Sequence, residues 1–172
     1  MYRNPYARLT IILVVFLGMA VLPVSRAGAD DMGHAAGMEQ GKVTRAIAVV
    51  HHLKSQQVLG TVTFTGAQDG LMLKGEFMNL APGSHGFHIH VYGDCTAPNE
   101  DSVGPHYMPA EHGEGYHGDL PMIEAGEDGR ATVEARLDRL ALTGPRSIIG
   151  RGLLVHGLDG SKIGCGVIGI DE

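Results

Sequence analysis

The sequence predicts an all-β domain, an antiparallel sandwich or barrel of seven or eight short strands. Several segments alternate apolar and polar residues with period two, which is the pattern of half-buried strands. Glycine accounts for 26 of the 172 residues, and turns that contain glycine separate most of these segments. No segment shows a sustained helical period with capping residues, so helices are not expected to dominate the fold.

The strand candidates follow one another along the chain from residue 43. The clearest alternation lies at 71–78, where Leu73 and Phe77 alternate with Lys74 and Glu76. Spacing of this kind is typical of antiparallel sandwiches and barrels. The other candidates are 43–50, 58–65, 87–91, 131–137, 148–155 and 164–170.

The N-terminal segment has the features of a secretory signal peptide. Basic Arg3 and Arg8 precede an apolar run at 9–22, and small residues at 27–29 form a cleavage site. The apolar run has about 14 residues, fewer than the ~20 that a membrane span needs, so a retained anchor is the weaker alternative. We expect residues 1–29 to be removed, leaving a protein with no stable membrane span.

Charge and cysteine content limit the partners and the compartment. The chain has 13 Lys and Arg against 19 Asp and Glu. Loss of three arginines with the signal segment leaves a net charge of about −9, so nucleic acid is not an expected partner. Export to an oxidising compartment permits a lasting bridge between the two cysteines, Cys95 and Cys165. Closing a loop of about 70 residues would stabilise the fold by roughly 4 kcal/mol.

The residues after the signal segment divide into an arm and a domain. Residues 30–41 are polar, and we expect a flexible N-terminal arm because chain termini are usually untethered. This arm carries Met32, His34 and Met38, which are soft or borderline ligands that can hold copper weakly. The β domain is expected at 42–172.

Histidine is unusually frequent, with ten residues, most of them in the middle of the chain. His88 and His90 are two apart on a predicted strand, so both imidazoles share a face and can reach one ion. A lone strand histidine is more often structural, but here further candidates follow. The stretch 93–120 lacks a strand pattern, and so long a loop is usually functional. Imidazoles suit copper and zinc, and a carboxylate suits zinc. The further candidates are His106, His112, His117, Asp119 and His156.

Seven short motifs follow one another along the chain: GFHIH, GDC, GPH, HGDL, IIGR, VH and CGVIG. In sequence and order they resemble the copper/zinc superoxide dismutase family over nearly the whole chain from Val43. GFHIH together with the closing CGVIG is the most specific part of this signal. The resemblance implies an eight-stranded Greek-key β-sandwich or barrel. It also implies a disulfide between Cys95 and Cys165 that ties the metal loop to the last strand.

The resemblance assigns metal ligands position by position. His85 matches a histidine of the family motif that is structural and not a ligand. The implied activity is the dismutation of superoxide to dioxygen and hydrogen peroxide, in which copper changes its oxidation state and the bridging histidine takes up and returns a proton. Zinc would hold the loop and set the basicity of that histidine. The implied copper ligands are His88, His90, His106 and His156, and the implied zinc ligands are His106, which bridges the two metals, His112, His117 and Asp119.

The zinc loop departs from the family pattern. The spacing from His106 to His112 and His117 is compressed, and HGD replaces the longer H-x-G-D. His117 therefore either reaches the zinc from a shifted backbone or misses it. A copper-only site is the alternative to an intact copper and zinc pair.

Two further departures lie near the closing motif. The segment 157–164 is short where the family has a long charged loop, which predicts an open copper site and weak steering of superoxide. Asp159 either stands in for the aspartate that links the copper and zinc ligands or is an ordinary Asp-Gly turn residue. Lys162 replaces the family's channel arginine, three residues before Cys165, and lacks the planar fork that holds an anion by two hydrogen bonds. We expect a reduced activity from the shortened loop and from lysine in place of arginine. The alternative for Lys162 is a solvated surface residue.

The sequence therefore supports two functional hypotheses. The leading one is a periplasmic or secreted superoxide dismutase with copper and zinc as cofactors, superoxide as substrate, and His106 and Lys162 as catalytic residues. The alternative is a copper-binding protein for buffering or transfer, which would suit the shortened channel and the Met/His arm. Members of the family occur as monomers and as dimers, so a homodimer is compatible with the sequence but not selected by it.

Overall fold

The computed structural model describes residues 42–97, 101–109 and 118–172. The expected signal peptide and arm, together with His112 and His117, lie outside the described residues. No helix in the described ranges is long and apolar enough to cross a membrane. The elements are β1 (Arg45–His52), β2 (Val58–Ala67), β3 (Gly70–Phe77), β4 (Gly83–His85), β5 (Phe87–His90), β6 (Ile123–Ala125), β7 (Ala131–Leu137), the 3-10 helix η2 (Gly144–Arg146), β8 (Gly152–His156), β9 (Lys162–Val167) and β10 (Gly169–Ile170).

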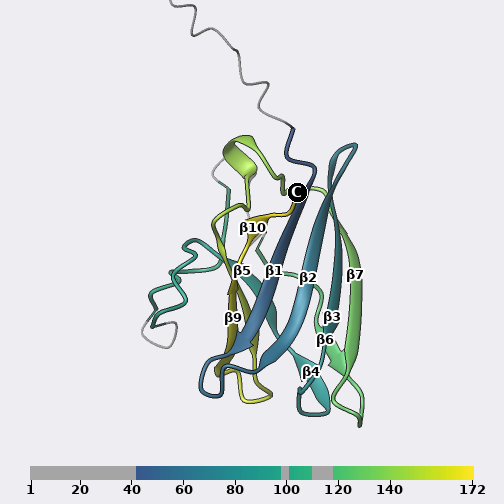
Figure 1. The fold of residues 1–172 in the computed structure, drawn as a ribbon, viewed down its shortest axis with the longest axis vertical. Helices are drawn as coiled ribbons and strands as arrows, with labels where there is room; N and C mark the ends of the chain where they lie inside the picture. Colours follow the sequence, from purple (N-terminus) through teal and green to yellow (C-terminus); the bar gives the residue numbers. More distant parts are fainter. Residues whose placement is uncertain (1–41, 98–100, 110–117) are drawn as a thin grey trace, which may run out of the picture. The chain divides into compact units, whose positions relative to one another are not determined.

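The strands form an antiparallel β-sandwich, as expected for the all-β class. Eight of them make one sheet in the order β5-β8-β9-β1-β2-β3-β7, with β10 beside β1, and β4 pairs with β6. Figure 1 shows β1 and β2 side by side, with β9 and β10 on one flank and β3 and β7 on the other. Phe77 of β3 and Phe87 of β5 pack edge to face with ring centroids 5.3 Å apart. Because β3 and β5 are far apart in the strand order, this contact requires the sheet to fold over onto itself.

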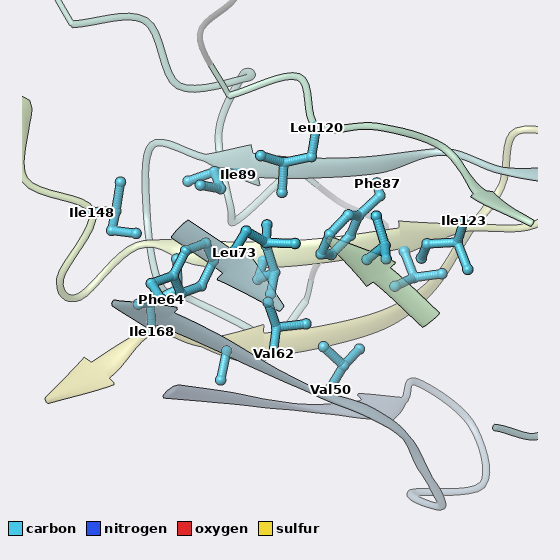
Figure 2. Close-up of a cluster of buried hydrophobic side chains, with 14 of the residues drawn as sticks. Val50, Val62, Phe64, Leu73, Phe87, Ile89, Leu120, Ile123, Ile148 and Ile168 are labelled. Atoms are coloured by element: carbon cyan, nitrogen blue, oxygen red, sulfur yellow. The ribbon is translucent and has the colours of Figure 1, made fainter. Parts of the chain in front are cut away.

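The core lies between the two layers of the folded sheet. Every second residue of β3 is buried, which confirms the alternation predicted at 71–78. In Figure 2 Phe64 and Leu73 from one layer lie in the same buried cluster as Phe87 from the other. Phe87 and Ile89 are fully buried in this core. His88 and His90 alternate with them along β5, so their side chains project to the opposite face of the strand. This alternation places the paired histidines outside the hydrophobic core.

Two predicted strands differ from the observed ones near the C-terminus. The candidate at 148–155 becomes a strand only at Gly152, because Gly150 turns the chain with φ of 78°. Ile148 is nonetheless fully buried, so its apolar character reflects core packing and not strand pairing. The candidate at 164–170 is divided into β9 and β10. At this break the Ile168 amide donates to the Arg151 carbonyl.

The long loop after β5 returns twice to hydrogen-bond with that strand. The Val91 amide donates to the Pro105 carbonyl at 3.0 Å, and the Tyr107 amide donates to the Ile89 carbonyl at 2.7 Å. Farther along the chain, the Ile89 amide donates to the Gly118 carbonyl at 2.8 Å. The described parts of the loop contain no strand before Ile123. These hydrogen bonds nevertheless fix them against β5, where His88 and His90 lie.

Candidate metal centre

Four histidine side chains converge beside β5. His88 and His90 come from β5 itself, His106 comes from the long loop, and His156 ends β8. One ring nitrogen of each lies within 4.8 Å of those of the other three. The ring centroids of His88 and His106 are 4.1 Å apart, and those of His88 and His156 are 4.8 Å apart. The structure thus brings together the four residues that the sequence predicts as copper ligands.

Backbone pairing explains how the distant histidines reach this cluster. β5 pairs with β8 so that His88 lies opposite Leu154, and the pairing of β8 with β9 is irregular between Val155 and His156. The His156 amide donates to the Gly86 carbonyl at 2.8 Å. His106 is drawn in by an isolated bridge to His90.

Three ring nitrogens in the cluster are buried without a hydrogen-bond partner among the described residues: His88 Nδ1, His90 Nε2 and His156 Nε2. The other nitrogens of two rings are fixed by the backbone. His90 Nδ1–H donates to the Gly104 carbonyl at 2.7 Å, and His156 Nδ1–H donates to the Gly160 carbonyl at 3.0 Å. These bonds set the tautomer, so each Nε2 carries a lone pair. Buried unpaired lone pairs are costly, and a bound metal ion would satisfy them.

The loop places a second donor pair next to the cluster. His106 Nδ1–H donates to Asp119 Oδ1 at 2.7 Å, while His88 and Asp119 form an isolated bridge. An imidazole nitrogen and a carboxylate oxygen are zinc-type donors, and zinc binding here would replace the proton that His106 Nδ1 shares with Asp119. Two of the four predicted zinc ligands are therefore neighbours; His112 and His117 lie outside the described residues.

The environment keeps the strand histidines neutral. Burial, then the nearby His106 and His156, lower the pKa of His88 from 6.5 to about 4, although Asp119 partly opposes this. Burial is also the main cause that lowers the pKa of His90, against the hydrogen bond to Gly104. Neutral imidazoles have the free lone pair that metal binding needs, so both residues suit a metal at neutral pH.

Lys162 begins β9 and its side chain is only 17% exposed. Its Nζ lies 2.6 Å from Asp101 Oδ1. The charge of Lys162 is one of the causes that lower the pKa of His90, so it acts at the histidine cluster. These contacts differ from those of a solvated surface lysine. Sequence reasoning missed Asp101, because an acidic residue in the loop gives no sign of which cation it faces.

Asp159 has the contacts of a turn residue. Its Oδ1 accepts hydrogen bonds from the Ser161 amide at 3.0 Å and from the Ser161 hydroxyl at 2.6 Å. These bonds lower its pKa and fix the turn whose Gly160 carbonyl holds His156. Asp159 therefore acts on His156 through the turn backbone, and the link to zinc ligands expected from the family is not among these contacts.

Two further described histidines, His85 and His52, form hydrogen bonds with the backbone. The two ring nitrogens of His85 each lie 2.8 Å from a carbonyl oxygen, that of His156 and that of Ala81, in agreement with the structural role expected of it. His52 Nδ1 accepts hydrogen bonds from two turn amides, Lys54 and Ser55, at 3.1 Å each. Neither ring is part of the four-histidine cluster.

A disulfide joins the start of the metal loop to β9. Cys95 and Cys165 are bonded, with their Cα atoms 5.8 Å apart and 70 positions between them in sequence. The bond anchors the loop close to Lys162, three residues before Cys165. It therefore links the two segments that supply Asp101 and Lys162.

An antiparallel β-sandwich with a cluster of four histidines from two strands and a loop, an adjoining His–Asp pair and one loop-anchoring disulfide defines a class of metal-binding β protein. A family model described as copper/zinc superoxide dismutase matches residues 58–168. The chain belongs to this family. The family and the histidine cluster together support copper and zinc as cofactors.

Two relatives show the same affiliation. The chain is 41% identical over 133 residues to the "Extracellular superoxide dismutase [Cu-Zn]" of Brugia pahangi, covering 73% of this chain and 65% of that protein. It is 43% identical over 133 residues to the "Superoxide dismutase [Cu-Zn]" of Onchocerca volvulus, covering 72% of this chain and 81% of that protein.

Proposed function

We propose that this chain is a superoxide dismutase that converts superoxide to dioxygen and hydrogen peroxide at a copper ion. The observation that carries the proposal is the set of three buried ring nitrogens without a described partner, all pointing into one cluster. Membership of the copper/zinc superoxide dismutase family supports the reaction assigned to that cluster. The proposed copper ligands are His88, His90, His106 and His156.

The protein's own groups have distinct tasks in this reaction. When bound, copper supplies reversible one-electron chemistry, and zinc supplies fixed positive charge without redox chemistry. The carbonyls of Gly104 and Gly160 orient His90 and His156 so that each presents Nε2. Because Asp119 holds Nδ1 of His106, we assign to Nε2 of His106 the uptake and return of a proton needed for peroxide. Lys162 supplies positive charge that favours the approach of the superoxide anion, and Asp101 offsets part of this charge.

We propose zinc binding by His106, His112, His117 and Asp119. The 2.7 Å contact between His106 and Asp119 supports half of this set. The same contact also suits a copper-only enzyme in which Asp119 bonds His106 directly. Metal analysis of the isolated protein separates the two: one zinc per copper supports the complete site, and copper without zinc supports the alternative.

We further propose export, with residues 1–29 as signal peptide, 30–41 as a flexible arm and 42–172 as the secreted or periplasmic domain. The word "Extracellular" in the name of the Brugia relative supports this. N-terminal sequencing of the exported protein should begin at Asp30. A homodimer is also proposed, as one of the oligomeric states compatible with the sequence. Sedimentation at micromolar concentration tests it.

The proposed reaction is tested with purified, metal-loaded protein. Wild-type protein should remove superoxide catalytically, and His156→Ala should lower the rate at least about a hundredfold, because the cluster loses one of its nitrogens. His51→Ala, which removes an exposed histidine outside the cluster, is the matched control and should retain the wild-type rate. Copper-replete wild-type protein without turnover would refute the enzyme proposal.

A copper-binding protein for buffering or transfer is the second candidate. It is favoured by the Lys162–Asp101 ion pair, which offsets the positive charge near the cluster, and by the short turn between His156 and Lys162. Tight copper binding with negligible dismutation would support it. A reduced but measurable rate, which we expect, supports the enzyme.

A further inference from the structure

Asp101 forms an ion pair with Lys162, a cation that lies beside the histidine cluster. Lys162 lies opposite His156 in the antiparallel pairing of β8 with β9, and residues directly opposite each other in such a pair share one face of the sheet. Lys162 is largely buried and Asp101 is 84% exposed. The ammonium is therefore held from the solvent side by a carboxylate at 2.6 Å.

The backbone fixes Asp101 in this position. Its φ is 62°, and its carbonyl accepts a hydrogen bond from the Gly104 amide at 2.8 Å. The Gly104 carbonyl in turn holds His90. One tight turn thus carries both the residue that pairs with Lys162 and the carbonyl that orients a cluster histidine.

Charge near the cluster depends on this pair. Lys162 alone would present one positive charge to an approaching anion, and positive charge beside a site raises the local anion concentration. With Asp101 in contact, the two charges cancel at distances larger than their separation. We propose that Asp101 is a positioning residue that restrains and neutralises Lys162, and thereby limits the attraction of small anions to the histidine cluster. This inference rests on the proposed function for its relevance to superoxide.

Azide, a small anion, is the probe for the inference in copper-loaded protein. Its dissociation constant is measured by titration of the visible spectrum. Asp101→Asn should tighten azide binding about two- to fivefold, since one negative charge is removed and the ammonium is released. Asparagine tolerates the left-handed backbone, so the turn should persist. Asp101→Glu keeps the charge and should behave like wild type.

The matched control is Asp138→Asn, which changes the net charge by the same amount. Asp138 follows β7 and forms a 2.6 Å ion pair with Arg136, and the substitution breaks this pair. It should leave the azide constant unchanged. Lys162→Gln should weaken azide binding, and the double variant Lys162→Gln with Asp101→Asn should return close to wild type, because its local charge is again neutral. Equal azide constants for Asp101→Asn and Asp138→Asn, or an unchanged constant in Lys162→Gln, would overturn the inference.

Superoxide kinetics separate this inference from the proposed function. If the protein is an enzyme, Asp101→Asn should raise kcat/KM at low salt, and the gain should fade as ionic strength rises, because salt screens the released charge. If wild-type protein shows no turnover, the proposed function fails, while the azide titrations still decide the role of Asp101.

Discussion

His88 remains uncharged at neutral pH because burial lowers its pKa from 6.5 to about 4. In the unfolded chain the same imidazole takes up a proton near pH 6.5, so between about pH 4 and 6.5 the unfolded state binds more protons than the folded state. The free energy of unfolding of metal-free protein should therefore fall as the pH decreases through this window. Urea denaturation at about pH 7 and about pH 5 measures the difference.

The matched variants for this prediction are His88→Gln and His51→Gln. Glutamine does not titrate, so the loss of stability between the two pH values should be smaller in His88→Gln than in wild type. His51 is exposed, and its variant should retain the wild-type pH dependence. An identical dependence in all three proteins would contradict the account of His88.

The cluster histidines could be predicted from the sequence because ligand identity is carried by short motifs. His88 and His90 follow from strand alternation, and His106 and His156 follow from the family resemblance; the structure brings all four together. The pairing of Lys162 with Asp101 could not be predicted, since it depends on how a loop with irregular backbone crosses the start of β9. The hydrogen bonds from His90 and His156 to the carbonyls of Gly104 and Gly160 could not be predicted either, because a pattern of side chains carries no information on backbone carbonyls.

At the scale of elements, Gly118 permits the metal loop to lie directly on β5. A Cβ at this position would lie 2.3 Å from the Ile89 carbonyl oxygen. Gly118→Ala should push the segment away from β5 and move Asp119 from His106, lowering zinc affinity about tenfold or more while copper affinity changes less. Chelator competition for each metal measures the two effects.

Gly169→Ala is the control for this prediction. Gly169 lies in β10, and a Cβ there would have no atom within 4 Å, so both metal affinities should stay at the wild-type values. Zinc retention in Gly118→Ala equal to that in Gly169→Ala would contradict the role of the loop contact.

The elements themselves were predicted unevenly. The alternation in β3 is confirmed because one face of that strand packs in the core and the other faces solvent. The three-residue strands β4 and β6 were missed, since segments so short carry no readable period. The predicted strand at 148–155 starts too early, because the buried Ile148 packs in the core from a turn.

At the scale of the whole molecule, the disulfide cross-links the metal loop and β9 across 70 positions of sequence. A loop of this length should stabilise the fold by roughly 4 kcal/mol through the entropy of the unfolded chain. We expect the double variant Cys95→Ser with Cys165→Ser to lose a free energy of unfolding of this order in metal-free protein. Urea denaturation measures it.

Reductant provides the internal control for the disulfide. Wild-type protein treated with reductant should unfold at the urea concentration of the double variant, and the variant itself should not respond to reductant. A wild-type midpoint that does not change on reduction would mean that the bond contributes nothing to stability.

We propose that one copper ion is bound by four imidazoles from three distant segments of the chain. A crystal structure of the copper-loaded protein, with anomalous scattering recorded at the copper edge, tests this. We expect a single copper peak in contact with Nδ1 of His88 and with Nε2 of His90, His106 and His156. A copper peak elsewhere, or one in contact with only two of these rings, would contradict it.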